Sequence, residues 1–151
     1  MKANLGRYCG KRKFSETPEP KGKVLKAGRN RFVIQEHFAK KAGRHHDFRL
    51  EMEGVLKSWA VPKGVPEKTG TKRLAISVED HPVSYINFEG EIPKDLYGAG
   101  TVKIFDKGKY KLIEKTKDKI IFDLKGKKLR GGYALIKMKG RKNWWLMFRT
   151  K

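Results

Sequence analysis

The chain has 151 residues, of which 37 are Lys or Arg and 16 are Asp or Glu, so its formal net charge is +21. This length fits one domain that buries a core without disulfides, and such an excess of positive charge indicates a polyanionic partner such as nucleic acid. The sequence shows no long apolar run, basic amphipathic helix or secretory leader, which argues against a membrane protein or a secreted protein. We therefore expect a soluble, cytoplasmic, nucleoid-associated protein, with a monomer as the default oligomeric state.

Residues 1–30 are basic and interrupted by Gly and Pro, without the periodicity of a helix or a strand. This composition allows two interpretations, a disordered basic tail that screens phosphates or an ordered lid over a site. Arg12, Glu16 and Glu19 would have a direct function only in a lid. The pattern indicates an N-terminal arm that precedes a domain at 31–151.

From residue 31 onward, short alternating segments separated by glycine-containing turns predict strands, and no window predicts a long amphipathic helix. The segment 38–44 is expected to be a loop or a single helical turn, and Gly108 is expected to mark a break. About eight short strands favour a compact, closed or partly closed β-barrel with little helix, because closure removes exposed strand edges. A β-sandwich is the alternative. The expected strands are 31–37, 44–52, 56–62, 73–79, 101–105, 109–114, 119–124, 133–139 and 143–150.

In the segment R-H-H-D-F-R-L-E-M, residues that suit a functional site alternate with residues that suit a core. In a strand, His45, Asp47 and Arg49 leave one face, with successive Cα atoms about 6 to 7 Å apart, whereas Phe48 and Leu50 leave the other. An imidazole, a carboxylate and a guanidinium at this spacing are close enough to share a metal ion and a phosphate. The alternation therefore predicts a site on one face and a core on the other.

The preceding strand adds a second imidazole, because the alternation places Gln35 and His37 on the face that Asp47 shares. Two imidazoles and one carboxylate leave coordination positions open, as in a catalytic site, and this donor set suits Mn, Fe, Co, Ni or Zn rather than Ca. A divalent ion beside Arg49 would neutralise a phosphate. His81, which follows a strand and precedes a proline turn, could reach a phosphate oxygen or donate a proton.

The stretch 32–64, which begins F-V-I-Q-E-H and contains G-R-H-H-D-F-R-L-E-M, resembles the 3′-phosphoesterase module of bacterial ATP-dependent DNA ligase D and its stand-alone archaeal relatives. The resemblance continues through K-R-L-A-I-S-V-E-D-H-P-V-S-Y at 72–85, F-E-G-E-I-P at 88–93 and Y-G-A-G at 97–100, and it begins upstream in K-R-K-F-S-E-T-P-E-P. It covers nearly the whole chain, although the C-terminal part adds general agreement more than motif.

The resemblance implies a compact β-barrel enzyme that depends on Mn²⁺ and trims the 3′ ends of primer strands during DNA end repair by non-homologous end joining. Other divalent transition metals, such as Co²⁺ or Zn²⁺, suit the same ligands. A phosphodiesterase step removes a terminal ribonucleoside and leaves a 3′-phosphate, and a phosphomonoesterase step then yields a 3′-OH. The implied partners are DNA or RNA/DNA 3′ ends in a primer-template duplex, together with a separate DNA ligase and polymerase.

By its motifs, the resemblance implies that His37, His45 and Asp47 are metal ligands and that Arg49 and His81 hold the scissile phosphate. It also implies that Arg12 and Glu19 of the arm contact the substrate, which favours the ordered lid, and that Arg73 adds a further substrate contact. The remaining matches resemble supporting catalytic positions, and they are Gln35, Lys63, Arg73 and Tyr85, of which Tyr85 is tied to the monoesterase step.

The sequence departs from the family pattern at three places. Lys13 stands where the family has Asp, so the arm lacks an acidic group. The interval between His37 and His45 is longer than usual, which affects the connecting loop and not the strand faces. His46 replaces a tyrosine, and the alternation places it in the packing layer.

Two competing interpretations follow from the same residues. A non-catalytic nucleic-acid-binding β-barrel would account for the charge and the glycine-rich turns, but it leaves the face with His45, Asp47 and Arg49 unexplained. A purely structural metal site is disfavoured by the low number of ligands. End trimming of a primer separates an enzyme from a binding protein.

Overall fold

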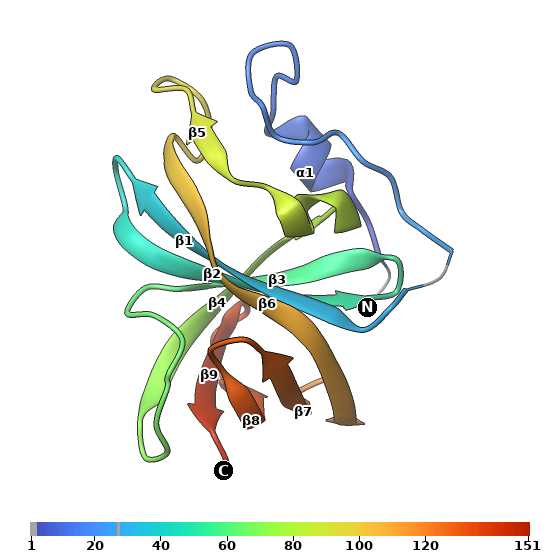
Figure 1. Ribbon diagram of the computed structural model, residues 1–151, viewed down its shortest axis with the longest axis vertical. Coiled ribbons are helices and arrows are strands. Elements are labelled where there is room, and N and C mark those ends of the chain that lie inside the picture. The colour runs from blue at the N-terminus through green and yellow to red at the C-terminus, as the bar shows by residue number, and fades with distance from the viewer. Residues whose placement is uncertain (1–2, 27) are drawn as a thin grey trace.

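A computed structural model describes residues 3–26 and 28–151, and its framework is a closed barrel of eight antiparallel strands (Figure 1). The order around the barrel is β1-β2-β3-β4-β9-β8-β7-β6, and β6 pairs back onto β1 to close it. A short strand, β5, pairs with the beginning of β6 outside this ring. The predicted β-barrel is confirmed, and the sandwich alternative is excluded. The strands are β1 (Arg31–Ala39), β2 (Gly43–Met52), β3 (Val55–Val61), β4 (Lys72–His81), β5 (Gly90–Ile92), β6 (Gly100–Lys115), β7 (Lys119–Gly126), β8 (Arg130–Lys137) and β9 (Trp144–Arg149).

The helical content of the described residues is small, as expected. It consists of α1 (Gly6–Gly10) in the arm and the 3-10 helix η1 (Val83–Asn87), which follows β4. Within the part of the chain that the structure describes, no helix is long and apolar enough to cross a membrane.

One connection differs from the sequence-based expectation, and another is the expected loop but shorter. The segments 101–105 and 109–114 form one continuous strand, β6, because Gly108 lies within the strand opposite Gly126 and lets the two backbones approach closely. A Cβ at Gly108 would collide with the carbonyl oxygen of Lys125. The segment 38–44 contains no helix, since β1 continues to Ala39 and β2 begins at Gly43, whose φ of +74° completes a tight hairpin.

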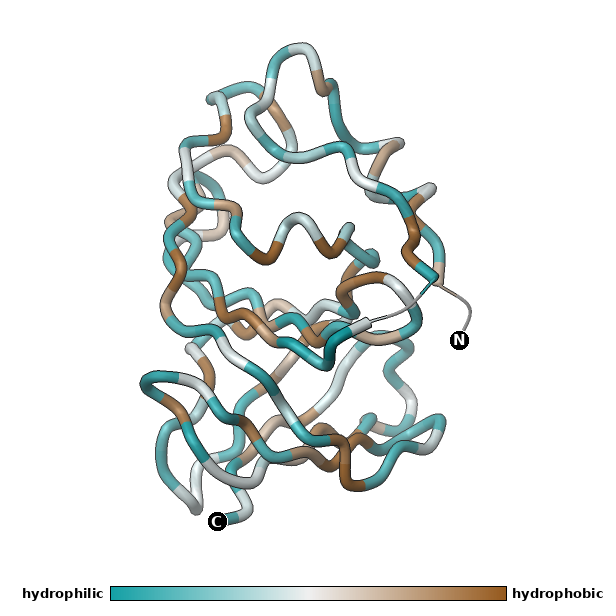
Figure 2. Tube along the Cα trace, turned by 45° about the vertical axis from the view of Figure 1, so that its right-hand side comes forward, coloured by the Kyte–Doolittle hydropathy of each residue, from teal (hydrophilic) through white to brown (hydrophobic). Residues whose placement is uncertain are grey.

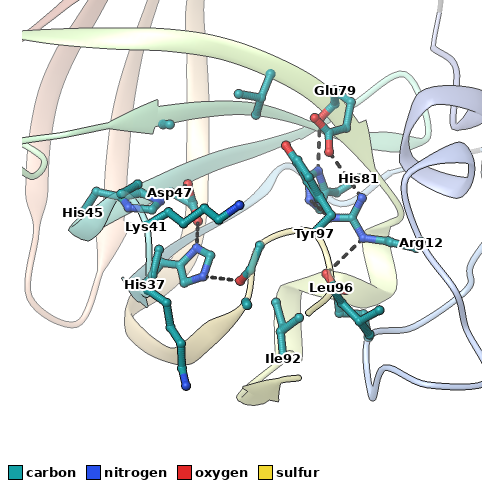
Figure 3. A pocket seen from close by; sticks show the side chains of 18 of the residues that line it. Arg12, His37, Lys41, His45, Asp47, Glu79, His81, Ile92, Leu96 and Tyr97 are labelled. Carbon is teal, nitrogen blue, oxygen red and sulfur yellow. Dashed lines mark hydrogen bonds and ion pairs between the residues drawn. The ribbon is translucent and has the colours of Figure 1, made fainter. Parts of the chain in front are cut away.

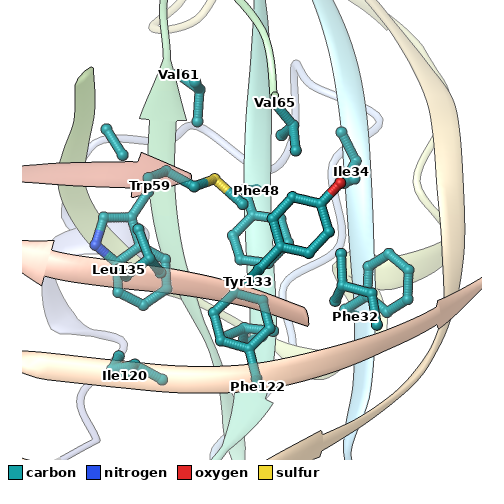
Figure 4. Close-up of a cluster of buried hydrophobic side chains, with 14 of the residues drawn as sticks. Phe32, Ile34, Phe48, Trp59, Val61, Val65, Ile120, Phe122, Tyr133 and Leu135 are labelled. Carbon is teal, nitrogen blue, oxygen red and sulfur yellow. The ribbon is translucent and has the colours of Figure 1, made fainter. Parts of the chain in front are cut away.

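The inward side chains of the barrel form its main core (Figure 4). Phe48 of β2 stacks on Phe122 of β7 with ring centroids 5.6 Å apart, and Phe122 stacks in turn on Tyr133 of β8 at 6.2 Å. Each such ring contributes about 1.5 to 3 kcal/mol when fully buried. Figure 2 shows hydrophilic and hydrophobic residues interspersed along the strands of the barrel. The apolar face predicted for Phe48 and Leu50 therefore faces the barrel interior.

A second apolar cluster lies on the outer face of β1 and β3, beneath the arm and η1 (Figure 1). Tyr8 of α1 is fully buried there against Tyr85 of η1, with ring centroids 5.9 Å apart. Val33 of β1 and Leu56 of β3 complete the contact from the barrel side. Because the arm and η1 cover this outer face, polar side chains that leave the same strands are partly enclosed rather than open to solvent.

Candidate active site

The three candidate metal ligands converge on the outer face of β1 and β2. His37 is directly opposite His45 in the antiparallel register, and Asp47 follows two residues along on the same face. His37 Nδ1 lies 3.3 Å from Asp47 Oδ2, and His45 Nε2 lies 3.2 Å from Asp47 Oδ1. One ligand atom from each of the three residues falls within 4.8 Å of the others (Figure 3).

Backbone carbonyls fix which nitrogen of each imidazole faces Asp47. His37 Nε2 donates to the carbonyl oxygen of Gly98 at 2.7 Å, and His45 Nδ1 donates to that of Gly43 at 3.3 Å. Because a carbonyl only accepts, these two nitrogens are the donors to the backbone, which leaves His37 Nδ1 and His45 Nε2 on the side of the Asp47 carboxylate. Two imidazole nitrogens and a carboxylate that converge in this way fit a divalent metal ion.

The Asp47 carboxylate remains ionised in this setting. Its burial would raise its pKa, but hydrogen bonds with His37 and His45 and the charge of Arg49 outweigh burial and hold the pKa of Asp47 well below its usual range. The pKa of His45 is raised, because the hydrogen bond and charge of Asp47 outweigh the burial of the ring. Asp47 therefore supplies a permanent negative charge to any ion bound here.

Gln35 fixes the orientation of Arg49 by a hydrogen bond, and the guanidinium of Arg49 lines the cavity. Arg49 Nε donates to Gln35 Oε1 at 2.7 Å, and Gln35 Nε2 donates to the carbonyl oxygens of Tyr85 and Phe88 at 2.9 and 3.1 Å. The Arg49 NH2 group lies 3.7 Å from Asp47 Oδ2. The buried NH1 group has no hydrogen-bond partner among the described residues, which leaves a charged donor for an anionic ligand.

His81, at the end of β4, is neutral and has a defined tautomer. Its Nδ1 donates to the carbonyl oxygen of Glu79 at 3.0 Å, so Nε2 is the acceptor that faces the Arg12 NH2 group at 3.3 Å. Burial, together with the charges of Arg49 and Arg12, lowers the pKa of His81 well below its usual value. His81 thus offers a proton-accepting nitrogen at neutral pH.

The arm contributes Arg12 and Glu19 to the same place. Arg12 Nε donates to Glu19 Oε2 at 3.0 Å, and Arg12 NH1 lies 3.3 Å from Glu79 Oε2. The Tyr85 hydroxyl donates to Glu19 Oε2 at 2.6 Å. Burial, reinforced by the charge of Glu19, raises the pKa of Tyr85 well above its usual value, so its hydroxyl remains a hydrogen-bond donor. These contacts join the arm to η1 and β4.

Most of the candidate residues line one cavity of about 660 Å³ (Figure 3). Gln35 lies beneath it, whereas Glu16 of the arm is exposed and does not line it. Lys63 and Arg73 line a separate hollow, in which Arg73 NH1 donates to the carbonyl oxygens of Lys63 and Gly64. The candidate residues that line the larger cavity are Arg12, Glu19, His37, His45, Asp47, Arg49, His81 and Tyr85.

Comparisons with known proteins agree with this geometry. The sequence profile of the DNA ligase D 3′-phosphoesterase domain matches residues 35–137. The multifunctional non-homologous end joining protein LigD of Mycobacterium bovis is 47% identical over 153 residues, and the corresponding proteins of Mycolicibacterium smegmatis and Pseudomonas aeruginosa are 46% and 41% identical over 160 and 157 residues. Each alignment covers 97% of this chain but 18 to 20% of the relative.

The chain belongs to the DNA ligase D 3′-phosphoesterase domain family. It spans about a fifth of the length of these LigD relatives.

Several residues of this phosphoesterase domain reach the cavity or its ligands without having been predicted from the sequence, and four of them bear on the candidate residues. Glu79 is buried and binds Arg12, and its place two residues before His81 on the same strand face was a usable signal. Tyr8 packs edge-on against His81, with ring centroids 4.9 Å apart. Tyr97 lines the cavity, and Gly98 contributes a carbonyl oxygen, which no side-chain pattern reveals.

Proposed function

We propose that the protein is a metal-dependent phosphoesterase that processes the 3′ ends of DNA or RNA/DNA strands in non-homologous end joining. Its two activities are removal of a 3′-terminal ribonucleoside and hydrolysis of the resulting 3′-phosphate. One observation carries this proposal. The candidate metal ligands His37, His45 and Asp47 line the same cavity as Arg49, whose NH1 group has no hydrogen-bond partner among the described residues. Membership in a 3′-phosphoesterase family supports a phosphate ester at a DNA 3′ end as the substrate class.

His37 Nδ1, His45 Nε2 and Asp47 are proposed to hold one divalent ion. Mn²⁺ is the expected ion, and Co²⁺ or Zn²⁺ would suit the same two nitrogens and one carboxylate. When bound, such an ion neutralises charge on the phosphate and polarises the phosphorus. Three protein ligands leave positions open for substrate and water, which is the pattern of a catalytic rather than a structural site.

The groups beside the triad are proposed to bind and orient the phosphate. Arg49 NH1 donates to a phosphate oxygen, and Gln35 keeps the guanidinium in that orientation. His81, whose Nε2 faces the same cavity, is proposed to contact the scissile phosphate beside Arg49 and to accept a proton from the attacking water once Arg12 turns to the substrate. Positioning and electrostatic stabilisation would thus come from residues on three strands and the arm.

The arm is proposed to act as a lid over the phosphate, in which Arg12 and Glu19 contact the substrate. Arg12 already reaches His81, and Glu19 reaches the hydroxyl of Tyr85. Tyr85 is proposed to donate a hydrogen bond in the monoesterase step, because its raised pKa keeps it protonated. Lys63 and Arg73 remain proposed contributors, but they lie outside the larger cavity.

The proposed partners are 3′ ends in a primer-template duplex, with a DNA ligase and a polymerase acting on the trimmed end. The charge of +21 supports binding to the phosphate backbone outside the cavity. We place the protein in the cytoplasm, at the nucleoid, and take a monomer as the working state.

A primer assay tests this proposal. The protein is incubated with a primer-template whose primer ends in a ribonucleotide or a 3′-phosphate, with Mn²⁺ and, separately, with a chelator. Shortening of the first primer and phosphate release from the second, both suppressed by the chelator, are expected. Stable binding without either product would support the non-catalytic binding protein instead.

A further inference from the structure

A second hollow, of about 280 Å³, lies on the opposite face of β2 from the metal ligands. Side chains alternate along β2, so His45 and Asp47 face the larger cavity whereas Arg44 and His46 face this hollow. The loop between β3 and β4 closes it from the other side and contributes Lys63 and Lys68. We call this site the basic hollow, and define it by Arg44, His46, Lys63, Lys68, Arg73 and Phe105.

His46 presents a buried hydrogen-bond donor to the basic hollow. The backbone N–H of Val65 donates to His46 Nδ1 at 2.9 Å, so Nδ1 is an acceptor and Nε2 carries the proton. Nε2 is buried without a hydrogen-bond partner among the described residues. The nearest carboxylate oxygen, Glu36 Oε2, is 3.6 Å away and is already paired with Arg44. Nε2 thus lies beside a carboxylate just beyond hydrogen-bond distance, and an anionic ligand in the basic hollow would be held mainly by its cations.

The charge of the basic hollow fits an anionic oxygen. Arg73 fixes the β3–β4 loop by donating to the carbonyls of Lys63 and Gly64, which holds Lys63 at the rim. Lys128 adds a further cation, 4.4 Å from the centre of the Phe105 ring. Glu67 is the acidic side chain among the described lining residues, against four Lys and Arg side chains. Several cations around one hollow are a feature of phosphate sites.

The turn between β1 and β2 and the start of β2 link the larger cavity to the basic hollow. Lys40 and Lys41, in the turn between β1 and β2, line the larger cavity, and Arg44, three residues after Lys41, lines the basic hollow. We propose that the basic hollow binds an internucleotide phosphate of the strand whose 3′ end occupies the metal site, an inference that rests on the proposed function. The hollow would thereby distinguish a long strand from a short oligonucleotide or a free phosphate.

The salt dependence of binding tests this proposal. Lys68→Gln removes one cation of the basic hollow, and Lys117→Gln, an exposed change in the β6–β7 turn, removes the same charge away from both cavities. Binding of a primer-template with an unmodified 3′-OH is measured by fluorescence anisotropy in chelator over a series of salt concentrations. Loss of one phosphate contact should reduce the slope of log Kd against log salt by about 0.9 for Lys68→Gln, with a smaller change for Lys117→Gln. Equal slopes for the two variants would overturn the proposal.

Substrate length provides the second readout. The weakening caused by Lys68→Gln should be larger for a long primer than for a dinucleotide that ends in a 3′-phosphate, and equal weakening of both would overturn the proposal. In the wild type, the His46 Nε2–H resonance should shift on addition of the long primer. A shift with inorganic phosphate but none with the primer would mean a free-anion site and would also overturn it.

These outcomes are separable from failure of the proposed function, because the binding measurements need no catalysis. If the protein trims primers normally but the two variants show equal slopes, only the proposed phosphate binding in the basic hollow is refuted. A protein that shows the expected difference in slope but never trims a primer refutes only the phosphoesterase.

Discussion

His37 Nε2 donates a hydrogen bond of 2.7 Å to the carbonyl oxygen of Gly98, and this bond turns His37 Nδ1 toward Asp47. Gly98 lies in the loop between β5 and β6, far from β1 in sequence, and its φ is +79°. The loop that orients the imidazole therefore depends on a backbone conformation that favours glycine. The same loop lines the larger cavity.

Gly98→Ala should weaken metal binding, because the left-handed conformation costs a non-glycine residue about 1 to 2 kcal/mol and the carbonyl would shift away from His37. Loss of an outer partner of a metal ligand weakens affinity by at least about tenfold. Calorimetric titration with Mn²⁺ measures this effect. The matched control is Gly140→Ala, since Gly140 has φ of +77° and a Cβ there would meet no atom within 4 Å. If both variants lose affinity equally, the carbonyl of Gly98 does not orient His37.

Gln35→Ala should lower kcat by removing the group that holds Arg49, and it should also destabilise the fold. The substitution leaves Arg49 Nε without its acceptor and removes the side-chain donor from the carbonyl of Phe88, whereas the carbonyl of Tyr85 keeps the backbone N–H of Phe88 as a donor. Unsatisfied buried groups cost about 1 to 3 kcal/mol each, so a clear drop in the melting temperature is expected. Thermal denaturation and turnover on a 3′-phosphate primer measure the two effects. An unchanged kcat in a folded variant would show that Arg49 does not need Gln35.

Tyr85→Phe should reduce phosphate release from a 3′-phosphate primer more than removal of a terminal ribonucleoside. The variant loses the hydroxyl that donates to Glu19 at 2.6 Å but keeps the ring that packs beneath Arg49, whose guanidinium carbon lies 4.9 Å from the ring centre. Separate assays on the two primers measure the two rates. Parallel loss of both activities would argue for a structural rather than a step-specific hydroxyl.

The free energy of unfolding should fall as the pH drops below about 6.5, partly because of His81. The folded pKa of His81 lies below the unfolded value of 6.5, since burial and the charges of Arg12 and Arg49 oppose protonation. Between the folded pKa of His81 and pH 6.5, the unfolded state therefore binds more protons than the folded state. The contribution of neutral His81 to the free energy of unfolding is present above pH 6.5 and is lost as the pH falls toward the folded pKa.

His81→Asn isolates this contribution, because its amide can still donate to the carbonyl of Glu79 but does not titrate. Urea denaturation of both proteins just below pH 6.5 should show a smaller loss of stability in the variant. The buried carboxylates Asp47 and Glu79 have lowered pKa values, so they titrate in a more acidic range. Identical pH dependence in the two proteins would contradict the assignment to His81.

Much of the site follows from strand alternation, which is a local property of the sequence. The structure places His45, Asp47 and Arg49 on one face of β2 and Phe48 in the barrel core, because a two-residue period determines the face of each side chain once the strand is identified. His46 also lies on the expected packing side, against Phe105 at 4.6 Å. Roles in catalysis for these residues stay predictions.

What the sequence does not reveal depends on contacts between distant segments. The metal-site carbonyl of Gly98 leaves no side-chain signal, and the position of Lys63 and Arg73 depends on the face over which the β3–β4 loop folds. The role of Gly108 is hard to predict for another reason, because glycine occurs both in turns and at close contacts between backbones. Gly108 permits a close contact between β6 and β7, which the pattern of turns could not distinguish from a break.

Phosphate release by the Asp47→Asn variant, measured over a Mn²⁺ titration on a 3′-phosphate primer, tests the central claim most directly. The substitution removes the negative charge between His37 and His45 but nearly preserves the shape of the side chain. The wild type should release phosphate to a plateau as Mn²⁺ rises, and the variant should release none at any concentration while circular dichroism shows the same β fold. Wild-type rates in Asp47→Asn with the same dependence on Mn²⁺ would contradict the assignment of this triad as the catalytic metal site.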